Sequence, residues 1–274
     1  MVTGSSTGIG AACSERLARM GFQVFAGVHD EDDLGDAARG GAPVTPVLID
    51  VTREETIAAA REQIAEAVGA AGLPGLVNNA GIAVGGPLEL LPMADLRRQL
   101  ETNVVGAIAV TQALLPMLRQ GHGRIVNVGS TSGRVAAPFA GPYAASKFAL
   151  RALSDSLRVE LRPWRIPVCL IEVGPVATEI WDKSLAEMDR RWQGMSPSAR
   201  ELYGPLFRAI RKSAEQRGKS GIPIKEVVDA IVHAMVSPKP RSRYVVGKVA
   251  RQIAIVSLLP DPIRDFLVRR ELRI

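Results

Sequence analysis

The chain has 274 residues, of which 47% are hydrophobic, and it carries a formal net charge of +6. This length and apolar content can bury one substantial core, so we expect a single domain over residues 1–274. A basic surface attracts polyanions, but the lysines and arginines are scattered and only 4% of the residues are aromatic. Base-stacking platforms, and with them nucleic acid binding, are therefore not expected.

The cysteines and the amino terminus indicate the compartment. Cys13 and Cys169 lie far apart, with no second Cys or His at ligand spacing, so we expect buried thiols and neither a disulfide nor a metal site. The amino terminus has no basic segment followed by an apolar one, and no stretch approaches the roughly 20 apolar residues that cross a bilayer. We expect a soluble protein of the reducing cytoplasm.

Short β-branched runs alternate with longer amphipathic segments, which is the pattern of βαβ units on a parallel sheet. The expected strands are residues 23–28, 44–50, 75–79, 124–130, 168–174 and 243–246. The expected helices are residues 11–20, 52–68 with a capping box at Thr52 and Glu55, 93–119, 142–162 and 224–236. The fold class is therefore α/β, a Rossmann-type doubly wound parallel sheet. Only Met1, Val2 and Thr3 precede the first glycine turn, so we expect a late start or an unusually short central strand, with weakened stability.

The segment Thr3-Gly-Ser-Ser-Thr-Gly-Ile-Gly10 is typical of a strand, a glycine turn and a helix start. Glycines let the backbone approach a pyrophosphate, and the free N–H groups of the helix start favour the anion. The spacing is not G-x-G-x-x-G, so a plain structural turn is the alternative.

Three further signals point to proton chemistry. Tyr143 and Lys147 lie four apart on one expected helix face, where an ammonium group would stabilise the phenolate. Ser130 closes an expected strand at its carboxyl end and could donate to a substrate oxygen. Asn103 interrupts an apolar helical face, where asparagine is disfavoured unless its amide is used. Each signal has a structural alternative: an exposed Tyr–Lys pair, a cap or a buried polar contact.

Together these motifs resemble the short-chain dehydrogenase/reductase family over residues 1–178, in the order turn, Asn79 and Gly81, Asn103, Ser130, Tyr143-x-x-x-Lys147. The resemblance implies that Tyr143 is the acid/base and that Ser130 donates to the substrate oxygen. Lys147 would tune the phenol and bind a ribose, and Asn103 would anchor a proton relay through water.

The resemblance also implies a nicotinamide dinucleotide cofactor. The residues that would bind it are Gly4, Ser6, Gly8, Ile9, Gly10, His29, Asp30, Asp50, Val51, Asn79, Gly81, Tyr143, Lys147 and Thr178. Asp50 and Val51 would contact the adenine, and Thr178 the nicotinamide amide. His29 stands where NADP-using members often carry Arg, and Asp30 opens an acidic cluster, so NAD is favoured over NADP. The cluster also fits a solvated helix start.

The segment Glu172-Val-Gly-Pro-Val-Ala-Thr178 departs from the commoner Pro-Gly order and resembles the branch of hydroxysteroid and retinol dehydrogenases. Residues 178–222 are irregular and rich in tryptophan and methionine, so we expect a helical substrate-binding lid. An apolar lid fits a small hydrophobic alcohol or carbonyl substrate such as a steroid or retinoid.

Residues 250–274 form an expected helical extension that combines an apolar stretch with several arginines. Such a segment fits an anionic membrane surface, but packing against its own domain or a neighbouring subunit is favoured. The family implies a homodimer or homotetramer through the helices 93–119 and 142–162. A dinucleotide-sensing or scaffold protein without chemistry is the alternative function.

Overall fold

The computed structural model describes residues 1–33, 44–178 and 180–272. Its strands are β1 (Val24–Val28), β2 (Val44–Leu48), β3 (Gly75–Asn78), β4 (Arg124–Ser130), β5 (Val168–Val173) and β6 (Arg243–Val246). All of their pairings are parallel, in the orders β1–β2 and β3–β4–β5–β6. Val2 bridges Ala26 of β1 and Val77 of β3 and so joins the two parts. The central strand is thus very short, which is one of the two alternatives that we expected.

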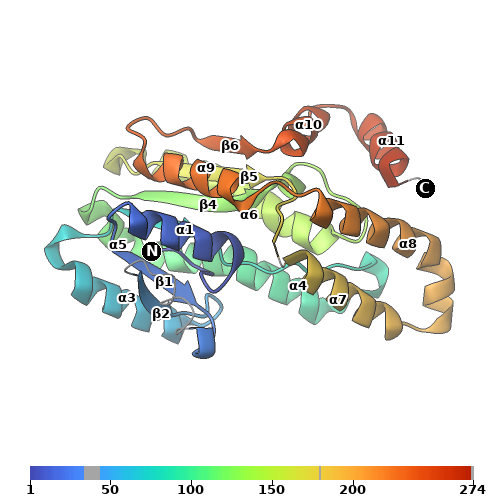
Figure 1. The fold of residues 1–274 in the computed structure, drawn as a ribbon, viewed down its shortest axis with the longest axis horizontal. Coiled ribbons are helices and arrows are strands. Elements are labelled where there is room, and N and C mark those ends of the chain that lie inside the picture. The colour runs from blue at the N-terminus through green and yellow to red at the C-terminus, as the bar shows by residue number, and fades with distance from the viewer. Residues whose placement is uncertain (34–43, 179, 273–274) are drawn as a thin grey trace.

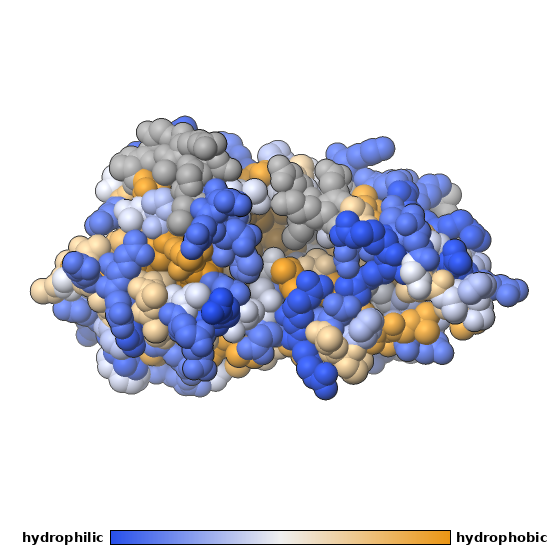
Figure 2. Space-filling view, turned by 90° about the horizontal axis from the view of Figure 1, so that it is seen from below, coloured by the Kyte–Doolittle hydropathy of each residue, from blue (hydrophilic) through white to orange (hydrophobic). Residues whose placement is uncertain are grey.

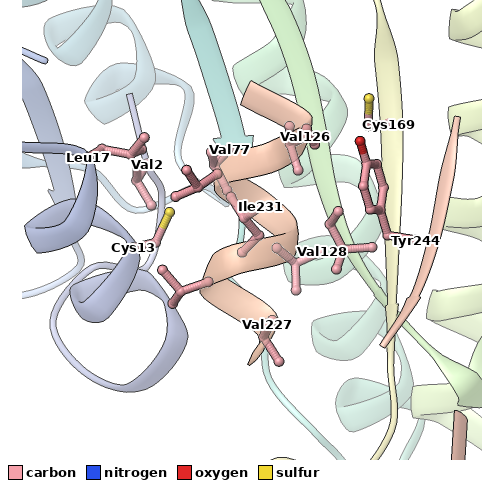
Figure 3. Packing of buried hydrophobic residues seen from close by; sticks show 14 of the residues in the cluster. Val2, Cys13, Leu17, Val77, Val126, Val128, Cys169, Val227, Ile231 and Tyr244 are labelled. Carbon is pink, nitrogen blue, oxygen red and sulfur yellow. The ribbon is translucent and has the colours of Figure 1, made fainter. Parts of the chain in front are cut away.

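The helices that cover the sheet confirm the doubly wound arrangement (Figure 1). The helices α1 (Gly8–Arg19) and α9 (Ile224–Val236) pack together on one face, and α3 (Glu54–Val68), α5 (Ala107–Gln120) and α6 (Gly141–Glu160) cover the other. Each face has its own core. Figure 3 shows the first, in which Ile231 of α9 and Cys13 of α1 pack on Val77 and Val126. The second contains Phe25, Ile57 and Leu114. Cys13 and Cys169 are free and buried, as expected.

Two expectations about helices need correction. The capping box at Thr52 and Glu55 is wrong: α3 begins at Glu54 after Arg53, without a side-chain cap. The Thr52 hydroxyl donates to Asp50 Oδ1 at 2.7 Å instead, so it is not turned to the helix. The helix expected at 93–119 is present as α4 (Met93–Leu100) and α5, but a π-helical turn, Glu101–Gly106, separates them.

The run Met93–Gln120 also departs from the expectation that no stretch is long and apolar enough to cross a membrane. By length and composition alone it could do so, and 39% of its most apolar window is buried. Val110, Leu114 and Leu118 of this run are buried in the second core cluster, against the sheet and α3. One face of α5 in this run therefore belongs to the core of the domain.

The segment expected to form a lid is helical. It contains α7 (Ile180–Gln193) and α8 (Pro197–Lys219), which project from the sheet together with α4 (Figure 1). The Trp192 and Phe207 rings stack at 4.0 Å and join the two helices. Arg191 binds Asp95 of α4 at 2.6 Å, and Tyr203 hydrogen-bonds Glu89. Residue 179 of this segment lies outside the described residues.

The carboxyl-terminal extension forms α10 (Lys248–Val256) and α11 (Asp261–Leu272). Ala250 and Leu272 are buried, and Glu271 pairs with Arg217 of α8 at 2.7 Å, so the extension packs in part on its own domain. Contact with a membrane stays a prediction. The last two residues lie outside the described part of the chain.

Candidate active site

The glycine-rich turn closes against the end of β3. Gly4 and Gly8 have φ angles of +65° and +60°, the left-handed region that glycine adopts without strain. A Cβ at Gly10 would lie 2.0 Å from the Gly4 carbonyl oxygen, so no other residue fits there. Asn79 Nδ2 donates to the carbonyl oxygens of Thr3 and Gly4 at 3.0 and 2.9 Å. Asn79 therefore fixes the turn that leads into α1.

The amino end of α1 fits the phosphates of a dinucleotide. No acidic residue lies in its first turn, so the free N–H groups and the helix dipole favour an anion. A Cβ at Gly8 would meet only the Thr178 methyl group, at 3.9 Å, and both residues line a cavity of about 450 Å³. The Ile9 side chain packs on the core, so its contact with a cofactor would come from its backbone. Ser6 is half-buried in the same turn.

Ser130, Tyr143 and Lys147 come together at the carboxyl end of β4. Ser130 ends that strand, and the other two lie one turn apart on α6, which packs on β4 and β5. The Ser130 hydroxyl lies near enough to Tyr143 to influence the pKa of the phenol, and Lys147 Nζ lies 5.6 Å from the centroid of the Tyr143 ring. The structure thus brings together the three residues that the sequence predicted for proton chemistry.

Burial decides the pKa values of this group. Burial raises the pKa of the Tyr143 phenol. Ser130 acts in the opposite direction, but its effect is the smaller of the two. Burial lowers the pKa of Lys147 to about 8. We expected Lys147 to lower the pKa of the phenol, and the direction in the structure is the opposite. The Lys147 ammonium group donates to the Val128 carbonyl oxygen at 2.9 Å instead of to the phenol oxygen.

Asn103 lies in the π-helical turn, and its whole amide is used. Its Oδ1 accepts from Ile82 N at 2.8 Å, and its Nδ2 donates to Ile82 O at 3.0 Å and to Ser146 Oγ at 3.1 Å. A Cβ at Gly81 would lie 3.1 Å from Asn103 Oδ1, so glycine allows this close approach. Asn103 therefore clamps the loop after Gly81 to α6, and its role in a proton relay stays a prediction.

The predicted adenosine end lies beyond β1. His29 contacts two carboxylates: Nδ1 lies 3.0 Å from Asp30 Oδ1 and Nε2 lies 3.5 Å from Asp50 Oδ2. The hydrogen bond with Asp30 is the main cause that raises the pKa of His29. Burial acts to raise the pKa of Asp50, but the Thr52 hydrogen bonds and His29 hold it below its usual value. Val51 is buried, so little of its side chain is open to an adenine ring.

Two features of the site escaped the sequence analysis. Gln99, one turn before Asn103, is fully buried and binds the same loop through Val84 N and Ile82 O. Arg134, just after Ser130, makes a two-pronged ion pair with the buried Glu172 of β5, at 2.9 and 2.6 Å. The four-residue spacing of Gln99 and Asn103 could have indicated the first. No local signal connects Arg134 with Glu172.

Comparison with known proteins gives the family. A family model described as short chain dehydrogenase matches residues 1–189. The NADPH-dependent 3-dehydrocapnine reductase of Ornithobacterium rhinotracheale is 35% identical over 100% of this chain and 96% of its own length. Human retinol dehydrogenase 16 is 37% identical over 97% of this chain and 86% of its own. The chain belongs to the short-chain dehydrogenase/reductase family.

Solved structures agree with this assignment. A short-chain dehydrogenase from Burkholderia cenocepacia in complex with NADP superposes with a TM-score of 0.72 and 28% identity, over 99% of this chain and 95% of the other. A short-chain dehydrogenase from Streptomyces avermitilis gives a TM-score of 0.77 and 26% identity, over 98% and 95%. The chain is therefore an oxidoreductase that acts on CH–OH groups with a nicotinamide dinucleotide.

Proposed function

We propose that this enzyme interconverts a hydrophobic secondary alcohol and its ketone, or an alcohol and its aldehyde, on a substrate of the steroid or retinoid class. The observation that carries the proposal is the group Ser130, Tyr143 and Lys147, assembled at the strand end where open α/β sheets bind ligands. The similarity to human retinol dehydrogenase 16 supports a bulky apolar substrate.

Tyr143, Ser130 and Lys147 have different roles in the proposed proton transfer. The bound nicotinamide ring supplies or accepts the hydride. In the direction of reduction, Tyr143 donates its phenol proton to the carbonyl oxygen of the substrate, and Ser130 donates a hydrogen bond to the same oxygen as negative charge develops. The raised pKa keeps Tyr143 protonated at neutral pH, which suits a proton donor. Lys147 binds the nicotinamide ribose and stabilises the phenolate that remains.

An apolar contact between the lid and the segment before α6 supports the substrate class. Phe139, which precedes α6, packs edge to face against Tyr203 of α8 with ring centroids 6.1 Å apart. Figure 2 shows a recess with apolar residues at its bottom, between the part of the molecule that carries β1 and the part that carries α7. Hydrophobic ligands are bound mainly by burial of apolar area, so a surface of this kind fits a steroid or a retinoid.

The test follows nicotinamide absorbance with purified enzyme, each reduced cofactor and a panel of steroid, retinoid and aliphatic carbonyls, with the alcohols in reverse. We expect turnover of one hydrophobic class. Tyr143→Phe should lower kcat by at least about 100-fold, because general acid catalysis contributes about that much or more. The Kd for the cofactor should change less than about twofold, since only the proton-donating oxygen is lost.

Turnover that survives Tyr143→Phe would refute the assigned acid/base. Cofactor binding without turnover of any substrate in the panel would instead favour a sensing or scaffold protein on this fold. The assembled group at Ser130 argues against that alternative, because a protein that only senses the dinucleotide has no use for a proton donor.

The support for NAD as the preferred cofactor comes from the acidic surroundings of His29. Asp30 and Asp50 flank its ring, so a 2′-phosphate there would meet two carboxylates, whereas ribose hydroxyls can donate to them. We expect a higher kcat/KM with NADH than with NADPH. His29→Arg should shift the ratio toward NADPH by about tenfold or more, and a wild-type preference above tenfold for NADPH would reject NAD.

A second copy of the chain is the proposed partner at the helices α5 and α6. Phe148, Val159 and Trp164 expose large apolar surfaces on or next to α6, and exposed apolar patches mark interaction sites. We propose a cytoplasmic homodimer or homotetramer. Light scattering should give two or four times the chain mass, and Val159→Glu should reduce it, while a monomeric wild type would exclude this assembly.

A further inference from the structure

The cavity of about 450 Å³ beside the glycine-rich turn is closed in part by the lid. Its lining residues are Gly8, Ala177, Thr178, Trp181, Gly218, Lys219 and Ile224. Gly8 stands at the amino end of α1, and Lys219 is the last residue of α8. Within this lining Lys219 supplies the charge, since the other residues are apolar or neutral. Lys219 of the lid thus lines the same cavity as Gly8 of the glycine-rich turn.

Backbone hydrogen bonds hold the end of α8 at this place. Ile222 N donates to Pro175 O at 2.9 Å, and Ala177 N donates to Ile222 O at 3.0 Å. These two bonds join the residues after α8 to the segment after β5, which continues into Thr178. Lys219 lies three residues before Ile222, so its position relative to Thr178 is set by the fold.

A close contact between Trp181 and Gly218 also holds the end of α8 beside the cavity. The Trp181 indole donates from Nε1 to Val176 O at 2.8 Å. A Cβ at Gly218 would lie 3.2 Å from Trp181 Cβ, so glycine lets α8 approach the indole closely. Lys219 directly follows this contact. The backbone at Lys219 is therefore held beside the cavity, and the residue itself is exposed, so its side chain is free to reorient.

The positive charge of Lys219 is complementary to the negative charge of a bound pyrophosphate. A dinucleotide pyrophosphate carries two negative charges, and the turn from Thr3 to Gly10 contains neither Lys nor Arg. Backbone N–H groups and the dipole of α1 favour the anion, but a charged donor adds a stronger hydrogen bond. Lysine offers three donors on a flexible stem and binds phosphate as a point charge.

We propose that Lys219 is a cofactor-binding residue of the lid, whose ammonium group pairs with the pyrophosphate of the dinucleotide bound at Gly8. This inference rests on the proposed function, because it requires a nicotinamide dinucleotide in the site. It makes the carboxyl end of α8 a part of the cofactor site.

Titration calorimetry of the full chain tests the inference, with NADH and with adenosine, which lacks phosphate. Lys219→Gln should raise the Kd for NADH about five- to tenfold, and Lys219→Arg should keep it within about twofold. Lys212→Gln is the matched control, because Lys212 is exposed on the same helix and outside the cavity lining. Added salt should weaken NADH binding more in the wild type than in Lys219→Gln. The Kd for adenosine should stay unchanged.

The outcomes separate the two proposals. Equal NADH affinities for Lys219→Gln and Lys212→Gln would overturn the role of Lys219 and leave the proposed function standing. A wild-type chain that binds neither NADH nor NADPH would overturn the proposed function itself. A parallel loss of adenosine affinity in Lys219→Gln would mean a general structural change and would also reject direct pairing with the pyrophosphate.

Discussion

Lys147 is a buried amine whose charged form the fold disfavours. Its side chain reaches from α6 to Val128 of β4 and is 7% exposed, and burial lowers its pKa from 10.5 to about 8. Between pH 8 and 10.5 the unfolded chain binds more protons at this position than the folded chain, so the free energy of unfolding rises with pH over this window. Below pH 8 the amine is charged in both states, and the full penalty of about 3 kcal/mol applies.

Lys147→Met should remove this pH dependence. Urea unfolding without cofactor at pH 7 and pH 10 measures it. We expect the wild type to gain about 2–3 kcal/mol relative to the variant between the two pH values. Lys248→Met, at an exposed position on α10, should show no such difference. If the wild type and Lys147→Met depend on pH in the same way, Lys147 is not the buried titrating group described above.

The π-helical turn between α4 and α5 sets the loop that follows β3. Gln99 and Asn103 extend from two successive turns to this loop. Gln99 Oε1 accepts from Val84 N at 2.6 Å, and Nε2 donates to Ile82 O at 2.8 Å. Extra residues in a helix turn are frequent at functional sites. Here the last turn of α4 presents Gln99 and the π-turn presents Asn103 to one loop, which continues from Gly81 of the predicted cofactor site.

Gln99→Leu should lower the free energy of unfolding by about 2 kcal/mol, because it leaves the buried Val84 N–H without an acceptor. Urea unfolding gives this value. The matched control is Gln63→Leu, since Gln63 is exposed and its hydrogen bond to Pro46 O is 3.4 Å long. The control should change stability by less than about 0.5 kcal/mol. Equal midpoints for the two variants would show that Gln99 does not hold the loop.

Elements with strong local signals were predictable from the sequence. The strand Arg124–Ser130 and the helix Ile224–Val236 have the expected bounds, because an apolar run and Pro223 mark them. The π-turn was not predictable, since hydrophobic periodicity carries no information about which carbonyl each N–H bonds. The Thr52 cap failed because Asp50, two residues earlier, competes for its hydroxyl. The approach of Ser130, Tyr143 and Lys147 to one another was predictable through family resemblance, whereas the pKa directions of Tyr143 and Lys147 depend on burial, which no motif encodes.

At the scale of the whole molecule, the site depends on the pairing of β4 with β5. Ser130 lies beside Val173 in this register, and the Glu172 side chain, 1% exposed, binds Arg134 of the loop that follows Ser130. A Cβ at Gly133 would lie 2.7 Å from the Lys147 carbonyl oxygen, so the same loop packs tightly on α6. The ion pair of Arg134 with Glu172 therefore ties β5, the strand that leads to the lid, to the loop between β4 and α6.

A double-mutant cycle at Arg134 and Glu172 tests this tie. Glu172→Leu should lower the free energy of unfolding by about 3–5 kcal/mol, because it leaves the Arg134 charge partly buried and unpaired. The double variant Arg134→Met with Glu172→Leu should lose less than the sum of the single variants, since it removes both charges. The more exposed pair Arg19 and Glu15 on α1, with the same replacements, should give a coupling below about 1 kcal/mol. Additive effects at Arg134 and Glu172 would mean that the buried pair does not join β5 to the loop that follows Ser130.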